Sequence, residues 1–386
     1  MQPSDESTVD AVALIGRAGV HCLTLRNGAV ASIRPAAKLE ARWLALPGLV
    51  NLHAHADRSF AVQSFRPRSF AEAMAAATAG KAAFTSADVE TRATRLFERS
   101  ITHGVTRLRT HTDVDPVAEL RFMHSVLAAR RVVASRLDVD VIAFSTSRND
   151  LAETEAVARL ERAIELGPDF LGASLNASSD PPRALDALLT LAERSNLPVD
   201  LHIDEHLDAG RALTPMVAEA VITRGLQGRV TFSHLCVLSM LAADHARALI
   251  DKIAAADVTV IALPETNLLL QDRMEGTPRR RGVTLVRELL AAGVKVRLGT
   301  DNVRDWFYPF GDGDMLETAR VAAVAAHLDD TTELVAAICD GRSTINEGAP
   351  ADLVLIPASS FDDALARHPA GRLVFKAGRQ VAGPSP

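Results

Sequence analysis

The feature that most constrains the fold is a regular alternation of short apolar segments with amphipathic ones. Eight segments rich in Val, Ile and Leu are predicted as strands, and they span Leu44–His55, Gly104–Asp113, Asp138–Ser145, Asp169–Ala177, Pro198–Glu205, Arg229–Leu235, Asp257–Glu265 and Val294–Asn302. Between two of them, Val157, Leu160 and Ile164 follow a helical spacing that ends at Gly167. Continuously apolar strands joined by helices are typical of a parallel sheet covered on both faces. Eight such units predict an α/β fold of the (β/α)8 TIM-barrel type.

An open, doubly wound sheet is the alternative to a barrel. It is disfavoured because no GxGxxG motif follows an early strand. The length of 386 residues and an apolar content of 48% suit one large catalytic domain with a small accessory one.

Both ends of the chain carry a different pattern, of short strands joined by turns. Asn27-Gly28 is a typical hairpin turn within the first such stretch, and a second hairpin is expected around Ala377-Gly378. We therefore expect a small composite β domain from residues 1–46 and 346–386, and a catalytic barrel from residues 47–345.

Composition excludes several classes of protein. The net charge of −6 does not suit nucleic-acid binding, and three widely spaced cysteines suggest neither disulfides nor a thiolate zinc site. The first ten residues lack the order of a signal peptide, and no apolar run is long enough for a membrane span. We expect a cytoplasmic protein.

A pair of histidines, His53 and His55, closes the first predicted strand. Residues two apart on a strand point to the same side, with Cα atoms roughly 6.6 Å apart. Two imidazoles at that spacing are able to meet on one ion, at Zn–N distances of about 2.0–2.1 Å. Alone, the pair is equally compatible with two structural histidines.

Further ligand-type residues occur at the ends of other predicted strands. His202 and Glu205 end the fifth, His234 ends the sixth, and Asp301 ends the eighth. In a barrel these strand ends face one mouth, where active sites lie. Their coincidence predicts a metal site there.

The order HxH, HxDE, SH and TDN resembles the amidohydrolase superfamily, and within it the cytosine deaminase branch. The similarity runs from about Val12 to the C-terminus and includes RTHTDV, DWFYPFG and EGAPADLVLIP. The resemblance implies that one Zn²⁺ or Fe²⁺ is held by a set of four ligands, namely His53, His55, His202 and Asp301. It also implies that Glu205 shuttles protons and that His234 holds the nucleophilic water or the tetrahedral intermediate. Asp301 is thereby expected to act in catalysis as well as in metal binding.

The residue types support those roles independently. Three neutral imidazoles and one carboxylate leave a divalent ion positively charged, so that it lowers the pKa of bound water towards about 7. Glu205 lies three residues past His202, close enough to take the proton of that water. The alternatives are a surface carboxylate at Glu205 and a buried core histidine at His234. One metal is expected, because the end of the fourth strand, ASLNASS, lacks the lysine that bridges two ions in other members.

His111, in the RTHTDV segment, ends the second strand. It is interpreted either as a hydrogen-bonding partner of a ligand or as a core histidine, and not as a ligand.

The substrate is less constrained. Thr146 stands where cytosine deaminases typically have a glutamine, and Asn302 where they usually have a second aspartate. Both departures disfavour cytosine itself. We expect Arg58, just past the first strand, to face an oxo or carboxylate group, with Trp306 or Phe307 stacking on a ring. The alternative is a rim residue paired with Asp57.

These patterns predict a metal-dependent deaminase that hydrolyses a C–N bond of a small nitrogen heterocycle, such as a pyrimidine or triazine, with release of ammonia or an amine. A ring-opening cyclic amidohydrolase is the nearest alternative. A non-catalytic metal-binding scaffold would not need Glu205 and His234, and a nicotinamide-dependent oxidoreductase has no support beyond the fold. The resemblance leaves a homo-oligomer open, because the family is often oligomeric.

Overall fold

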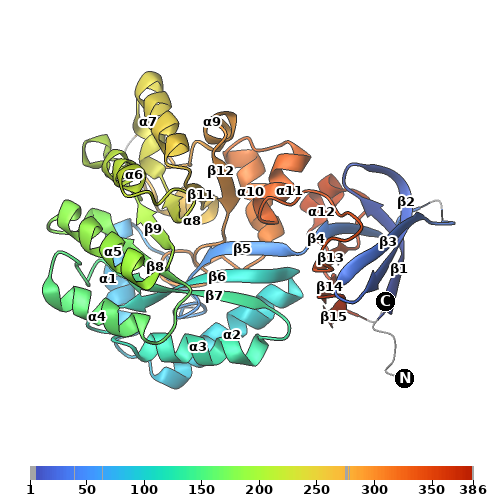
Figure 1. Ribbon diagram of the computed structural model, residues 1–386, viewed down its shortest axis with the longest axis horizontal. Coiled ribbons are helices and arrows are strands. Elements are labelled where there is room, and N and C mark those ends of the chain that lie inside the picture. Colours follow the sequence, from blue (N-terminus) through green and yellow to red (C-terminus); the bar gives the residue numbers. More distant parts are fainter. Residues whose placement is uncertain (1–5, 39, 63, 274–276, 278, 385–386) are drawn as a thin grey trace.

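The computed structural model describes residues 6–38, 40–62, 64–273, 277 and 279–384. Their strands form two sheets, one of eight strands and one of seven. Figure 1 shows the eight-stranded sheet surrounded by helices, with the seven-stranded sheet beside it.

The eight-stranded sheet is a parallel barrel. Its strands are β5 (Leu49–Ala54), β6 (Val105–Val114), β7 (Asp138–Ser145), β8 (Phe170–Ser174), β9 (Val199–Ile203), β10 (Val230–His234), β11 (Thr259–Ala262) and β12 (Lys295–Leu298). Neighbours in this order pair in parallel. A parallel bridge between Ala54 and Asp301 connects the first strand to the last, and the amide of Asp301 donates to the His53 carbonyl at 2.8 Å. The predicted TIM barrel is confirmed, and the open sheet is wrong.

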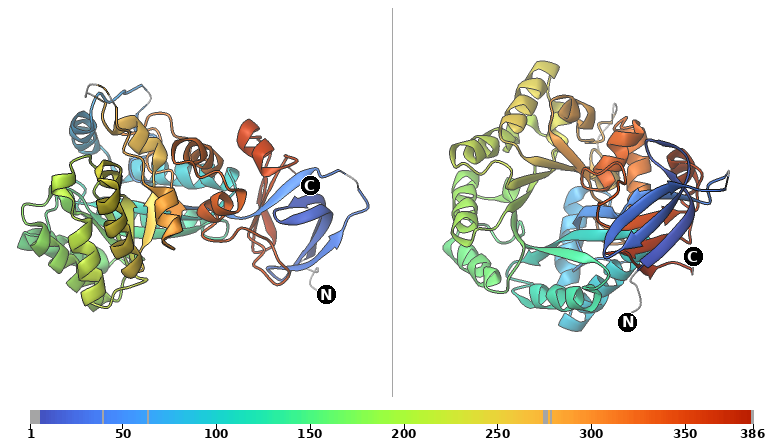
Figure 2. Two further views of the ribbon diagram at one scale, coloured as in Figure 1. Left: turned by 90° about the horizontal axis from the view of Figure 1, so that it is seen from above. Right: turned by 45° about the vertical axis from the view of Figure 1, so that its right-hand side comes forward.

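Helices surround the barrel strands (Figure 2). The α-helices are α1 (Phe70–Lys81), α2 (Ser86–Thr102), α3 (Arg121–Val133), α4 (Thr154–Ile164), α5 (Pro181–Ser195), α6 (Thr214–Thr223), α7 (Ala243–Ala255), α8 (Pro264–Leu270), α9 (Val286–Ala291), α10 (Met315–Ala325), α11 (Thr331–Ile338) and α12 (Phe361–Arg367). Short 3-10 turns follow three strands, at Leu175–Ala177, Ala209–Arg211 and Cys236–Met240. Helix α4 buries Leu160 of the predicted apolar stripe against the core, as expected from its spacing.

The seven-stranded sheet combines both ends of the chain. Its order is β15-β14-β13-β4-β1-β2-β3, and its strands span β1 (Glu6–Leu14), β2 (Arg17–Arg26), β3 (Ala29–Pro35), β4 (Trp43–Pro47), β13 (Leu353–Ile356), β14 (Leu373–Lys376) and β15 (Arg379–Ala382). Strand β4 pairs in parallel with β1 and antiparallel with β13, which joins the two ends. Asn27 and Gly28 have φ of 53° and 76°, as a hairpin turn of this type requires. The predicted composite sheet is confirmed.

One predicted strand is wrong in its extent. Leu44–His55 divides at Gly48 into β4, which belongs to the terminal sheet, and β5, which belongs to the barrel. A Cβ atom at Gly48 would lie 2.3 Å from Thr106 Oγ1, so only glycine allows the chain to cross between the sheets here. Sequence periodicity does not register this crossing, because both halves are equally apolar. The exact domain boundaries at residues 46/47 and 345/346 stay a prediction, and residues 1–5, 39 and 385–386 of the predicted β domain lie outside the described residues.

A second predicted strand, Asp257–Glu265, also extends too far, because Pro264 begins helix α8. Proline is favoured at the first turn of a helix, where its missing N–H is not needed. Of the helices in the described chain, none is long and apolar enough to cross a membrane.

Candidate metal centre and active site

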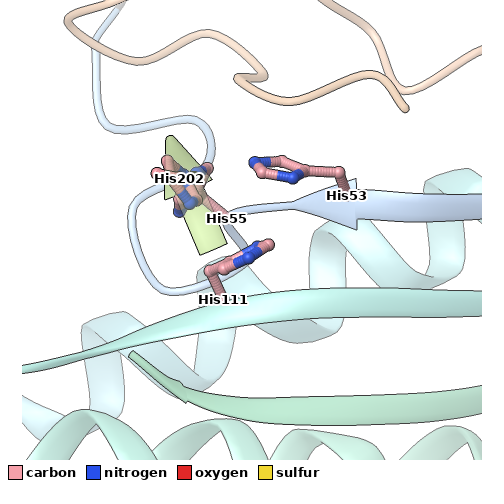
Figure 3. Close-up of side chains that lie close together, drawn as sticks. All are labelled: His53, His55, His111 and His202. Atoms are coloured by element: carbon pink, nitrogen blue, oxygen red, sulfur yellow. Dashed lines mark hydrogen bonds between the residues drawn. The ribbon is translucent and has the colours of Figure 1, made fainter. Parts of the chain in front are cut away.

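Four side chains converge at the mouth formed by the carboxyl ends of the strands. They are the predicted ligands, which we call the metal cluster: His53, His55, His202 and Asp301. The Nε2 atoms of His55 and His202 lie 3.2 Å apart, and Asp301 Oδ1 lies 3.2 Å from His55 Nε2 and 3.5 Å from His53 Nε2. Figure 3 shows the rings of His53, His55 and His202 gathered at one point beyond the strand ends, with His111 beside them.

This geometry fits a single ion. Two ligands that each lie about 2.0–2.1 Å from a tetrahedral Zn²⁺ are roughly 3.3–3.4 Å apart, which matches the observed separations. The cluster is buried, and among the described residues His53 Nε2 and Asp301 Oδ2 have no hydrogen-bond partner. Buried polar atoms are rarely left without a partner, so these atoms suit a bound cation.

The protonation states also suit a metal. Burial lowers the pKa of His53 to about 4 and lowers the pKa values of His55 and His202 further below the usual range. These imidazoles are therefore neutral at pH 7, as metal ligands must be. Burial alone would raise the pKa of Asp301, but its contacts with His53 and His55 hold it well below the usual value.

A chain of hydrogen bonds fixes the ring of His53. Ser233 Oγ donates to Asp200 Oδ1 at 3.1 Å and lies 2.9 Å from His53 Nδ1. Because its own proton goes to Asp200, Ser233 accepts from the Nδ1–H of His53. The other nitrogen, Nε2, is then left unprotonated and faces Asp301. Arg109 completes the chain by donating to Asp200 at 2.9 Å.

His111 lies next to this chain and is fully buried. Its Nε2 is 3.4 Å from Asp200 Oδ1, and its ring centroid is 4.1 Å from that of His53. One of its nitrogens also lies within 4.8 Å of ligand atoms of the three cluster histidines. Among the described residues, neither ring nitrogen of His111 has a hydrogen-bond partner, so its interpretation as a partner of a ligand or as a core histidine stays a prediction.

The two predicted proton-transfer residues lie beside each other at the cluster. His234 ends β10 with a φ of 76°, and its Nδ1 lies 3.1 Å from Asn267 Oδ1 and 3.7 Å from Glu205 Oε1. Its Nε2 is buried without a partner in the described chain. Both side chains line the cavity described below, which argues against a surface role for Glu205 and a purely structural role for His234. Burial raises the pKa of Glu205 to about 7, against the opposing effect of His234.

Asp204 explains why Glu205 faces the cavity. Its backbone has a φ of 53°, and its buried carboxylate accepts hydrogen bonds from the amides of Leu213 and Thr214 and from Asn176. These contacts anchor the loop after β9 and turn the next residue inward. A left-handed backbone at Asp204 costs conformational free energy, and the hydrogen bonds of its carboxylate with the loop offset that cost.

A cavity of about 310 Å³ opens on the metal cluster. Helix α1 and the loops after β7, β8 and β9 contribute to its lining. All five predicted substrate-binding residues line it, namely Arg58, Thr146, Asn302, Trp306 and Phe307.

The five residues differ in whether their side chains already have protein partners. Arg58 donates to Asp305 at 3.1 Å and to Asp113 at 3.4 Å and lies 5.0 Å above the Phe307 ring, so in the described chain it does not form the ion pair with Asp57 that was the alternative. Trp306 stacks on Phe84 with centroids 5.7 Å apart.

Thr146 and Asn302 already have protein partners. Thr146 Oγ1 donates to Asp115 at 2.9 Å. The amide of Asn302 donates to Asp305 at 2.7 Å and accepts from Thr266 at 3.2 Å. These two residues therefore shape the cavity more than they offer free hydrogen bonds.

Several residues of the site are absent from the sequence predictions. Ser233 and Asn267 orient the two histidines, and the cavity is also lined by Lys81, Asp113, Arg148 and Arg211. Asp113 follows His111 at a strand end, which was a usable signal. No sequence pattern points to Lys81, because its position in the site depends on how helix α1 packs over the mouth of the barrel.

Three comparisons place the chain among known proteins. The model of the amidohydrolase family matches residues 155–382. A pterin deaminase of Rhizobium rhizogenes is 33% identical over 313 residues, which are 78% of this chain and 71% of that protein. Among solved structures, the Klebsiella pneumoniae 5-methylcytosine deaminase with phosphonocytosine matches with a TM-score of 0.89, 25% identity and 98% of both chains covered. The N-isopropylammelide isopropylaminohydrolase of Burkholderia multivorans gives a TM-score of 0.83 at 27% identity, also over 98% of both chains.

Proposed function

Because this chain belongs to the amidohydrolase family, we propose that it is a metal-dependent aminohydrolase that removes an amino group from a nitrogen heterocycle. The observation that carries the proposal is the convergence of His53, His55, His202 and Asp301, with separations of 3.2–3.5 Å that suit one ion. Its relatives, a pterin deaminase and an ammelide aminohydrolase, are named for reactions of this class.

In this proposal the metal cluster holds one divalent ion, Zn²⁺ or Fe²⁺. Such an ion supplies Lewis acidity, which lowers the pKa of water and produces a nucleophile at neutral pH. The chain contributes neutral, oriented imidazoles, since the Ser233 hydroxyl fixes the tautomer of His53.

Glu205 and His234 move the protons. Glu205 takes a proton from the attacking water and delivers it to the leaving nitrogen, which departs as ammonia or an amine. A carboxyl with a pKa of about 7 is suited to both steps, because it gains and loses a proton readily near neutral pH. The partnerless Nε2 of His234 faces the same space, where it holds the water or the oxygen of the tetrahedral intermediate.

The substrate we propose is an amino-substituted heterocycle with an oxo group near Arg58. The 310 Å³ cavity has room for more than one small ring, and its aromatic wall of Phe144, Trp306 and Phe307 suits a flat molecule. Among the classes named by its relatives, pterins rank first, because that relative is 33% identical. Cytosine ranks lower, because Thr146 cannot offer the paired donor and acceptor of an amide.

Metal analysis followed by an ammonia assay tests the proposal. We expect about one equivalent of Zn or Fe per chain in purified protein, and loss of activity after chelation that the metal restores. A panel of pterins, aminopyrimidines, aminotriazines and cyclic ureas would identify the substrate. Ring opening without ammonia or amine release would support the cyclic amidohydrolase alternative.

A histidine variant provides the control for that experiment. His53→Asn should lose both metal and activity, whereas His245→Asn, on the exposed face of α7, should lose neither. Full turnover by metal-free protein would contradict the proposal.

A further inference from the structure

We propose that Lys81 is a specificity-determining residue, whose ammonium donates a hydrogen bond to an oxo or ring-nitrogen acceptor of the substrate, next to Arg58. This inference rests on the proposed function and names the part of the substrate that the cavity wall beside helix α1 recognises. No motif in the sequence points to Lys81, which is the last residue of helix α1.

Lys81 is a buried cation on the cavity wall. Its side chain is 7% exposed and its Nζ lies 2.7 Å from Asp113 Oδ2, with a second ion pair to Asp115. Burial lowers the pKa of Lys81, but the two carboxylates outweigh that effect and keep it above its usual value. The ammonium is therefore charged at neutral pH.

An ammonium group has three N–H donors and no acceptor. In the described part of the chain, its recorded partners are the carboxylates of Asp113 and Asp115, which use two donors. Because Lys81 also lines the cavity, the third donor is available to a molecule bound there. We expect this third N–H to be accepted by a neutral or anionic atom of the substrate.

Asp113 couples Lys81 to Arg58. One carboxylate oxygen of Asp113 binds Lys81, and the other lies 3.4 Å from Arg58. Two cations held on one carboxylate present donors side by side, which suits the carbonyl oxygen of a lactam rather than an amino group. A cationic or amino edge would be repelled, so the same pair also disfavours binding the ring in reverse.

A second metal at this place is the main alternative. His55, Asp57 and Asp113 offer ligand atoms within 4.8 Å of one another. However, both oxygens of Asp113 already bind cations, and Asp57 accepts the backbone amide of Asp113 at 2.9 Å. Asp113 therefore has no free oxygen for a metal.

The position of Lys81 is firmly determined by its neighbours. Gly80 lies against Trp306, where a Cβ atom would come within 2.0 Å of the indole ring. This contact holds the end of α1 at the edge of the cavity, where Lys81 forms part of the lining. The ammonium is consequently pre-positioned before any substrate binds.

The test compares two probes that differ in the 4-oxo group and the N3 proton that accompanies it, 2-amino-4-oxopteridine and 2-aminopteridine. Metal-loaded Glu205→Gln protein allows their binding to be measured by fluorescence without turnover. We expect the otherwise wild-type cavity to bind the oxo probe about 10- to 100-fold more tightly, which is typical of one charge-assisted hydrogen bond. Adding Lys81→Met should remove most of that preference while changing the binding of 2-aminopteridine less than about 3-fold.

Two further variants separate specificity from folding. Lys81→Arg retains a charged donor and should recover part of the preference, whereas Lys295→Met, which removes a lysine paired with Asp257 at the far end of β12, should leave both affinities unchanged. Melting temperatures and metal content would be recorded for each protein. If Lys81→Met fails to fold, the role of Lys81 is tested by the oxo preference of the Lys81-containing protein and by the change in that preference in Lys81→Arg.

The outcomes distinguish this inference from the proposed function. Equal binding of both probes before mutation, no binding of either, or an equal loss for both in Lys81→Met would overturn the role of Lys81. A preserved oxo preference in protein that releases no ammonia from any compound would instead contradict the aminohydrolase proposal alone.

Discussion

Ser233 Oγ lies 2.9 Å from Nδ1 of His53 and donates its own hydrogen bond to Asp200. This contact decides which nitrogen of His53 is available to a metal. A hydroxyl one residue before His234 thus controls the chemistry of a ligand on a different strand, and it links the sixth strand of the barrel to the first.

Replacing Ser233 by alanine removes this orientation. We expect Ser233→Ala to weaken metal affinity by about 10- to 100-fold, as is typical when the outer partner of a ligating histidine is lost. Chelator competition measures it. Ser239→Ala, whose hydroxyl donates to the Cys236 carbonyl at 2.8 Å outside the cluster, is the matched control. Equal affinities for both variants would show that the contact does not orient the ligand.

Glu205→Gln preserves the shape of the side chain but cannot move a proton. We expect kcat to fall by about 10²- to 10⁴-fold with unchanged metal content. Steady-state ammonia release and elemental analysis test both parts. Glu219→Gln, on helix α6 with its ion pair to Lys252, should behave like the wild type. An unaltered kcat would remove Glu205 from the mechanism.

Arg58→Met retains the contact with Phe307 but removes the charge. For the true substrate we expect kcat/KM to fall by about 10- to 100-fold, mainly through KM, because a charged hydrogen bond to the oxo group is lost. Arg95→Met is the control, because Arg95 also lies over an aromatic ring, at 4.1 Å from Phe60, but outside the cavity. An unchanged kcat/KM would mean that Arg58 does not contact substrate.

Glu265 predicts how stability varies with pH. Burial raises its pKa to about 8, and Thr318 donates to its carboxyl at 2.8 Å. Between about pH 4.5 and pH 8 the unfolded chain releases this proton while the folded chain retains it, so the free energy of unfolding falls as pH rises. Below that window the effect is absent, and above it the loss is complete.

Glu265→Gln removes this titration. The variant should therefore gain stability relative to the wild type as pH rises from about 5 to 8, by on the order of a few kcal/mol. Denaturant unfolding at several pH values measures the difference. The exposed variant Glu90→Gln should follow the wild type throughout. A constant difference between Glu265→Gln and wild type across this range would contradict the proposed protonation of Glu265.

Much of the site was visible in the order of residues along the chain. His53 and His55 are two residues apart on β5, and strand geometry alone predicts that they point the same way. His202, His234 and Asp301 end or closely follow other strands, and parallel strands of a barrel bring such ends to one mouth. Those inferences depend only on local periodicity.

Other features depended on packing between distant segments. The crossing at Gly48 follows from its contact with Thr106, and the ring orientation of His53 follows from Ser233. The hydroxyl of Thr146 donates to Asp115, which is 31 residues away in the chain. None of these pairs has a fixed spacing in sequence, so no pattern search would find them.

By itself, the sequence determined the barrel, the composite terminal sheet and the types of residue at its mouth, because alternating polarity and strand-end positions are local properties. The tertiary structure alone decided which donors remain free and which are already used. Lys81 illustrates the difference: its charge is evident from sequence, but its spare N–H depends on Asp113 and Asp115, which only the packing of α1 over the mouth brings within reach.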